Sequence, residues 1–188
     1  LIQNLTYQNT SNNPNAARTL QLSITDGSGG TMTPQNIVIN VTSQVENFTL
    51  TSGNDNFLGD TTNDGFGGTA ANLSSAADTL AGGGGNDVLD IYGGVLTLNT
   101  STFANLTGIE TVTLSINGAH SITVADAYFS TSGYVGNTFV VTSNSAYATG
   151  ITVNASAVTN TSRNINVTGS GGNDVVTGSA GNDTITGN

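Results

Sequence analysis

Six aspartates in this chain share a local pattern that suits the binding of a hard cation. Each lies two residues before a large apolar residue, and four of them follow a glycine by two positions. The six are Asp55, Asp64, Asp78, Asp87, Asp174 and Asp183. Carboxylate oxygens and the carbonyl oxygens of tight, glycine-rich loops are ligands that Ca²⁺ accepts, so the pattern predicts calcium binding. The candidate glycines are Gly53, Gly83, Gly85, Gly172 and Gly181.

A spacing of nine residues connects these aspartates. The step is nine from Asp55 to Asp64, and the same step ends at Asp87 and at Asp183. Between Asp64 and Asp78 the step is fourteen, which is one repeat plus an insertion of five residues. Because one register relates so many aspartates, the pattern indicates a structural repeat rather than chance composition.

The stretch 82–90 keeps every fixed place of the nonapeptide G-G-x-G-x-D-x-U-x, in which U is a large apolar residue. Over residues 52–90 and 170–188 the chain resembles the RTX (repeats-in-toxin) family of secreted calcium-binding proteins. In that family each nonapeptide is half a turn of a right-handed parallel β-roll, with a six-residue loop followed by a short strand. The resemblance implies that the residues at place eight point inward and stack. They are Phe57, Phe66, Leu80, Leu89, Val176 and Ile185.

Alternate loops of such a roll stack on the same side, so we expect Asp55 to lie near Asp78, and Asp64 near Asp87. Parallel strands are about 4.8 Å apart, and stacked carboxylates without a cation would therefore repel each other. We expect one calcium ion between the loops of each pair, with folding coupled to binding. The alternative is that the loops of Asp64 and Asp78, which lack most of the glycines, bind nothing and only stack.

Residues 91–169 keep the strand pattern without the strict nonapeptide. Strands are expected at 95–98, 111–116, 121–124, 138–141, 151–153 and 164–167. Taken two at a time, their spacing exceeds the eighteen residues of a β-roll turn and favours a wider, continuous β-helix; an inserted β-sandwich is the alternative. The segment 106–114 resembles stretches of giant RTX adhesins and RTX-type S-layer proteins. Within it, Glu110 is expected to be a solvated loop carboxylate, with a metal ligand as the alternative. Residues 125–129 are expected to form a short helical turn.

The N-terminal residues 1–46 have a different pattern. Alternating apolar residues predict strands at 18–25 and 35–45, which form a hairpin around a glycine-rich turn that follows Asp26. A further strand is expected at 1–7. Residues 5–11 and 22–31 resemble the last strands of cadherin-like or Ig-like repeats. The predicted fold is therefore all-β: the end of an Ig-like β-sandwich (1–46) followed by a calcium-binding β-roll/β-helix (47–188).

The composition excludes several classes of function. Twelve acidic residues against two basic ones give a net charge of −10, which disfavours nucleic acid and anionic membranes but suits a cationic partner. There is no cysteine, no apolar run that could cross a membrane and no signal-peptide pattern at the start. The single histidine, His120, lies in a turn and is expected to be exposed. Since serine-hydrolase and zinc-protease motifs are absent, the segment is not predicted to be an enzyme.

These observations predict a structural, calcium-binding segment of a bacterial surface or secreted protein, such as an adhesin, an S-layer protein or a filament component. The resemblance implies type I secretion and folding outside the cell on meeting calcium. The alternative is the C-terminal roll of a secreted protease or lipase whose catalytic domain lies upstream. Self-association is also considered, because solenoids need capped ends and both ends of this one look uncapped.

Overall fold

The computed structural model describes residues 17–22, 28–30, 33, 35–40, 45–73 and 78–188. The chain divides into two compact units, 1–44 and 45–188. In the first unit, β1 (Ala17–Leu22) pairs antiparallel with β2 (Gln35–Asn40), which confirms the predicted hairpin. The predicted strand at 1–7 and the predicted turn at Asp26 lie outside the described residues. The relation to an Ig-like repeat stays a prediction.

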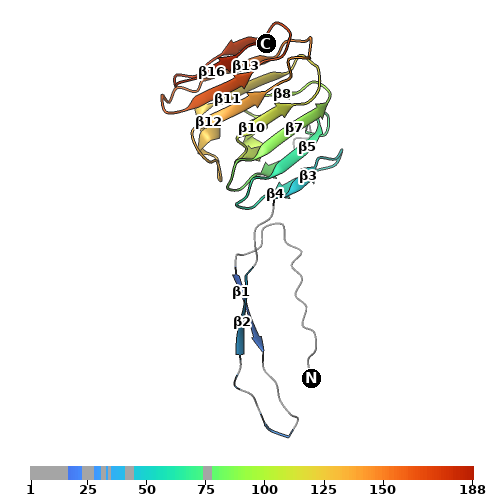
Figure 1. The fold of residues 1–188 in the computed structure, drawn as a ribbon, viewed down its shortest axis with the longest axis vertical. Helices are drawn as coiled ribbons and strands as arrows, with labels where there is room; N and C mark the ends of the chain where they lie inside the picture. Colours follow the sequence, from blue (N-terminus) through green and yellow to red (C-terminus); the bar gives the residue numbers. More distant parts are fainter. Residues whose placement is uncertain (1–16, 23–27, 31–32, 34, 41–44, 74–77) are drawn as a thin grey trace. The chain divides into compact units, whose positions relative to one another are not determined.

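The second unit is a parallel β-solenoid (Figure 1). Its first wall contains β3 (Asn47–Thr49), β5 (Gly65–Thr69), β7 (Val88–Gly93), β10 (Thr111–Leu114), β12 (Thr138–Thr142), β14 (Asn164–Thr168) and β16 (Thr184–Thr186). The opposing wall contains β4 (Asn56–Leu58), β6 (Thr79–Ala81), β8 (Thr97–Leu98), β9 (Leu106–Thr107), β11 (Ser121–Ala125), β13 (Thr152–Ala157) and β15 (Val175–Thr177). The first wall is one seven-stranded sheet with the order β16-β14-β12-β10-β7-β5-β3. The opposing wall is made of two sheets, β4-β6-β9 and β15-β13-β11-β8.

The length of a turn changes along the solenoid. Strand register places Asn47 beside Gly65 and Asn166 beside Thr184, so the turns at the two ends have 18 residues. In the middle, Thr111 lies beside Val140, a turn of 29 residues. Every strand pair described in this unit is parallel. The prediction of one continuous solenoid that widens and narrows is therefore confirmed, and the alternative of an inserted β-sandwich is wrong.

Two short 3-10 helices lie in the wider turns. They are η1 (Thr102–Asn105) and η2 (Asp126–Ser130), and η2 confirms the predicted helical turn. Among the residues that the structure describes, no helix combines the length and apolar character needed to cross a bilayer.

The core is built from inward side chains that stack in register. On the first wall, Phe66, Leu89, Val112, Val141 and Val167 lie beside one another on successive strands, and each is at most 1% exposed. These residues belong to one buried cluster that also contains the inward residues of the opposing wall. Burial alternates with period two along the strands, as expected for sheets with one inward face.

The predicted place-eight residues differ in burial. Phe66, Leu80 and Leu89 are fully buried, while Phe57 and Val176 are partly buried and pack against the core. Ile185 was expected inside the roll, but it is 52% exposed. It continues the column of Val167, and β16 is the last strand of its sheet among the described residues.

Replacement of Leu89 by alanine should lower the free energy of unfolding by about 2–5 kcal/mol, because it leaves a cavity in a fully buried column. The matched variant Ile185→Ala changes the same place of the repeat on an exposed strand, and its cost should be roughly 1 kcal/mol or less. Urea unfolding followed by circular dichroism measures both. Equal losses for the two variants would contradict the stacked core described above.

Candidate metal centre

The predicted aspartates all stand immediately before strands of the solenoid. Those before β4, β5, β6 and β7 are almost completely buried, and those before β15 and β16 are half-buried. The first four are Asp55, Asp64, Asp78 and Asp87, and the last two are Asp174 and Asp183. A residue at this point ends a loop and begins a strand, so its side chain is held by both.

Each predicted aspartate on a later turn accepts a hydrogen bond from the turn before it. The N–H of Asp55 donates to Asp78 Oδ1 at 3.0 Å, and the N–H of Asp64 donates to Asp87 Oδ1 at 2.7 Å. The structure therefore brings together the two pairs expected from the repeat spacing. On the C-terminal turns, Asp174 and Asp183 accept bonds from the N–H groups of residues 151 and 165, at 2.9 Å and 2.8 Å.

Both glutamates of the chain belong to the same arrangement, although Glu46 was not predicted as a site residue and Glu110 was expected to be solvated rather than a metal ligand. The N–H of Glu46 donates to Asp64 Oδ1 at 2.8 Å, and the N–H of Asp87 donates to Glu110 Oε2 at 2.9 Å. Glu46, Asp64, Asp87 and Glu110 thus form one series on successive turns, called here the carboxylate column. The expectation that Glu110 is solvated was wrong, since it is 3% exposed. The signal was present: each glutamate lies two residues before an apolar residue and directly before a strand.

Burial and mutual repulsion make the carboxylate column costly when all of it is charged. Burial raises the pKa of Asp87 to about 7; the hydrogen bond from Asp64 lowers it, while the charges of Glu110, Asp64 and Asp60 raise it further. Burial likewise raises the pKa of Glu46 and of Glu110. Asp60, which is 4% exposed, adds a further acid beside the column.

No described basic side chain compensates this charge. Of the two arginines in the chain, Arg163 is the one in the solenoid unit. Its guanidinium donates to Gly136 O and Asn137 Oδ1, both at 3.0 Å, and lies 5.2 Å from the ring centre of Phe129. The carboxylate column therefore needs a cation from solution, or protons, to reach low energy.

The C-terminal aspartates are stabilised in a different way. Burial would raise the pKa of Asp174, but hydrogen bonds from residues 151 and 170 outweigh it and lower the pKa. The Ser170 hydroxyl donates to Asp174 Oδ1 at 2.7 Å, and the Ser179 hydroxyl donates to Asp183 Oδ1 at 2.6 Å. Asp55 has an equivalent donor in the Thr51 hydroxyl at 2.9 Å. Hydroxyl groups satisfy these three carboxylates, whereas the carboxylate column has none at the matching place of Asp64 and Asp87.

Beside two glycines that precede Asp64 and Asp87, a carboxylate oxygen and a backbone carbonyl oxygen converge. Each of these two arrangements is called here an oxygen cradle. A Cβ placed on Gly59 would stand less than 3.0 Å from both Asp64 Oδ2 and the carbonyl oxygen of Gly82. A Cβ on Gly82 would meet Asp87 Oδ2 and the carbonyl oxygen of Gly108 in the same way. Among the described residues no three acidic or histidine side chains converge on one point, so carbonyl oxygens would have to complete any cation site. Carboxylate plus carbonyl oxygen is a donor set that fits Ca²⁺.

The five glycines predicted from the sequence have different structural roles. Gly83 and Gly85 have φ of +90° and +125°, which side chains rarely adopt. A Cβ on Gly172 or Gly181 would collide with the backbone of a neighbouring turn. Gly53 has only an ordinary contact with Thr51 Oγ1, so neither its contacts nor its φ require glycine.

A parallel β-solenoid with buried carboxylates and glycine-lined loops at its strand starts defines a metal-binding β-roll. The sequence profile of the RTX calcium-binding nonapeptide repeat (4 copies) matches residues 74–94 and 166–188. The chain therefore contains RTX calcium-binding repeats, and their ion is Ca²⁺. Asp78, Asp87, Asp174 and Asp183 lie inside the matched residues. No curated protein and no solved structure gives a significant match to the chain.

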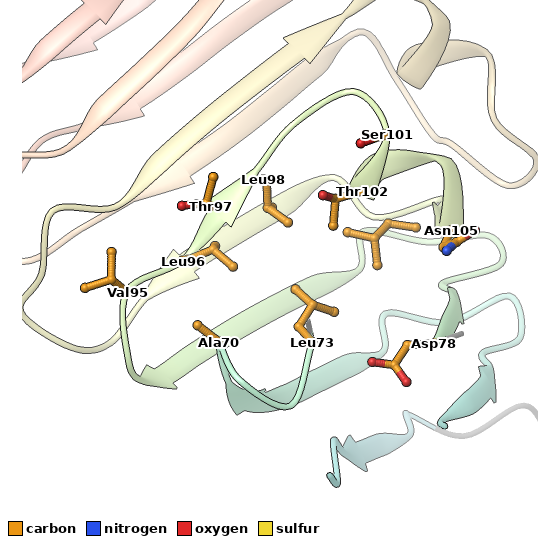
Figure 2. A pocket seen from close by; sticks show the side chains of 11 residues that line it. Ala70, Leu73, Asp78, Val95, Leu96, Thr97, Leu98, Ser101, Thr102 and Asn105 are labelled. Carbon is orange, nitrogen blue, oxygen red and sulfur yellow. The ribbon is translucent and has the colours of Figure 1, made fainter. Parts of the chain in front are cut away.

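A cavity of about 430 Å³ opens beside the part of the chain between β7 and β10 (Figure 2). Its lining is largely aliphatic and includes Leu73, Leu96, Leu98 and Leu106. Asp78 is the one titratable residue in the lining, and paired-carboxylate hydrolysis needs two. The RTX repeat is a structural calcium-binding motif and is not itself catalytic.

His120 corrects a further expectation. It was expected to be exposed, but it is 2% exposed. Its Nδ1 accepts the N–H of Leu96 at 3.0 Å, and its Nε2 lies 2.9 Å from Ile116 O, to which it donates in the tautomer that this pattern requires. The ring stands directly before β11 and accepts a bond from the preceding turn, as the carboxylates do on other turns.

The calcium-free protein should lose stability as the pH rises from about 4 to about 7. The pKa of Asp87 is about 7 in the folded state against an ordinary value of 3.8. In that window the folded state binds more protons than the unfolded state, so stability falls as these protons are lost. Urea unfolding at several pH values measures the slope, and Asp87→Asn should flatten it. A variant with the wild-type slope would show that Asp87 does not have the raised pKa.

The oxygen cradle beside Gly82 should reject a methyl group. Gly82→Ala should lower the free energy of unfolding by about 1–3 kcal/mol, because its Cβ would displace Asp87 and the Gly108 carbonyl. The matched control is Gly84→Ala, whose Cβ would meet only Thr61 Cα, at an ordinary 3.8 Å. That variant should change stability by less than about 1 kcal/mol. Thermal and urea unfolding in calcium measure both, and a tolerated Gly82→Ala would argue against the cradle.

Proposed function

We propose that this chain is a calcium-dependent structural segment of a bacterial surface or secreted protein, of the adhesin, S-layer or filament kind. The solenoid folds when calcium binds outside the cell, after secretion through a type I route. The observation that carries this is the carboxylate column: four acids stacked on successive turns, with no basic partner among the described residues.

Buried negative charge opposes the folding of this solenoid. Ionised carboxylates that leave water without a counter-charge oppose folding, and the raised pKa of Asp87 is a direct sign of that opposition. A calcium ion offsets the cost only once the turns have brought the oxygens together. We therefore expect calcium binding to be coupled to the folding of the turns from Glu46 to Glu110, which suits a protein that meets calcium after export.

The predicted ligands do not all have equal support. The strongest support is for Asp64 and Asp87, whose carboxylates form the oxygen cradles beside Gly59 and Gly82. Asp55, Asp174 and Asp183 already accept hydroxyl hydrogen bonds, so the ions proposed there should bind more weakly. Asp78 completes the pair with Asp55. The glycines at 53, 83, 85, 172 and 181 remain the proposed carbonyl donors.

Assembly of copies is a further part of the proposal. Sheets can be extended by strands of another molecule, so a solenoid of this kind can be lengthened by a second copy of the chain. Size-exclusion chromatography with light scattering, with and without calcium, reports the mass directly.

Calcium titration should convert the solenoid from a weakly ordered to a fully folded state. At a hundredfold excess over Kd, each ion adds about 2.7 kcal/mol, which corresponds to a rise in Tm of roughly 5–10 °C. Far-UV circular dichroism and thermal melting measure the change, with magnesium at equal concentration as the matched ion. If neither calcium nor a chelator changes the far-UV spectrum or the Tm, the proposed function is refuted.

A further inference from the structure

A second cavity, of about 350 Å³, lies on the first wall of the solenoid, and none of the four acids of the carboxylate column lines it. Its floor is a row of three threonines, Thr113, Thr142 and Thr168, which the strand register places side by side on β10, β12 and β14. Burial alternates along these strands, and the three threonines belong to the outward set. Because neighbouring strands are about 4.8 Å apart, the floor is an evenly spaced row of outward hydroxyl groups.

One side of this cavity is the loop that follows β12, from which Asn144 and Tyr147 line it. Asn144 O accepts the N–H of Tyr147 at 2.9 Å, and Asn144 Oδ1 accepts the N–H of Ala146 at 2.8 Å. The carbonyl oxygen of Tyr147 accepts the N–H of Gly171, on the next turn, at 2.8 Å. Since three hydrogen bonds fix the loop and a sheet forms the floor, the cavity is preorganised, which lowers the cost of binding a ligand.

The lining of this cavity is rich in hydrogen-bonding groups and carries no charge. Except for Leu114, every described residue that lines it has a hydroxyl or an amide side chain, and none is acidic or basic, although the whole chain has a net charge of −10. Hydroxyl and amide groups can both donate and accept hydrogen bonds. An ion would leave water here without a counter-charge, and an apolar ligand would leave these groups unpaired. The lining therefore fits a neutral ligand that has many hydroxyl groups of its own.

We propose that this cavity binds one sugar ring of an uncharged glycan. The hydroxyl groups of Thr113, Thr142 and Thr168 bond to the hydroxyl groups of the sugar, and Tyr147 supplies an aromatic surface for its carbon skeleton. Among the described lining residues there is no carboxylate or imidazole that could act as a general acid or base, so the glycan is held and not cleaved. The site goes beyond the proposed function, because it gives a surface segment a ligand other than calcium and uses none of the carboxylate column.

Amide NMR spectra of the full chain in saturating calcium, titrated with glucose, galactose, mannose and N-acetylglucosamine, locate the site without any variant. At least one of these sugars should shift the signals of Thr142, Tyr147 and Thr168. The matched charged probe is the uronate of the sugar that binds, in which a carboxylate replaces one hydroxymethyl group, and its affinity should be at least tenfold lower. A uronate that binds as tightly as the neutral sugar, or shifts that map to another part of the chain, would overturn the proposal.

Thr142→Val removes a hydroxyl group from the floor and keeps the shape of the side chain, so the affinity for the sugar should fall at least tenfold. The matched control is Thr123→Val, the same change at an outward position of β11 on the opposing wall, and it should bind as the wild type does. If no neutral sugar shifts the signals of the cavity, or Thr142→Val keeps the wild-type affinity, the site is overturned while calcium-dependent folding stands. If sugar binds but calcium changes neither fold nor Tm, the proposed function fails and the site stands.

Discussion

One hydrogen bond, repeated from turn to turn, holds the loops of this solenoid in register. The N–H at the start of a strand donates to an acceptor side chain at the start of the paired strand on the next turn. Such an N–H is buried at the point where the ladder begins, and it needs a partner. Where the acceptor is a carboxylate on several successive turns, the same bond gathers like charges. This one interaction therefore aligns the turns and also creates a group of negative charges that a cation can neutralise.

The glycines of the repeat follow from that carboxylate. Asp64 Oδ2 and Asp87 Oδ2 turn back over residues 59 and 82, which stand five positions earlier, and leave no room there for a Cβ. Where the earlier position holds an apolar residue, as Leu50 does before Asp55, the residue is buried in the core instead. The matching aspartate then takes its second partner from Thr51. A glycine at place one does not exclude such a hydroxyl partner, because Asp174 and Asp183 turn back over Gly169 and Gly178 and also accept the hydroxyl groups of Ser170 and Ser179.

The sequence was most informative where side-chain type and spacing are both constrained by stacking. The step from Asp64 to Asp87 predicted adjacent turns, because identical loops must superpose. The repeat pattern gave wrong predictions for Glu110 and His120, because a strict nonapeptide has neither residue at its sixth position. Both were taken for exposed loop residues, although any acceptor that reaches the preceding N–H can serve. The burial of Ile185 was also mispredicted, because a repeat pattern contains no information about which strand lies at the edge.

Three kinds of side-chain acceptor bond to the N–H groups at the strand starts along the solenoid. We infer that they give its parts a different dependence on calcium. In the carboxylate column the acceptors are carboxylates with no basic partner among the described residues, and the proposed function places calcium ions there. At Asp174 and Asp183, serine hydroxyls supply the extra donor, and for Asp174 the hydrogen bonds lower the pKa of the carboxyl. At His120 the acceptor is an uncharged ring nitrogen, which adds no negative charge. We therefore infer that the wide middle turns around β11 depend less on calcium than the turns from Glu46 to Glu110.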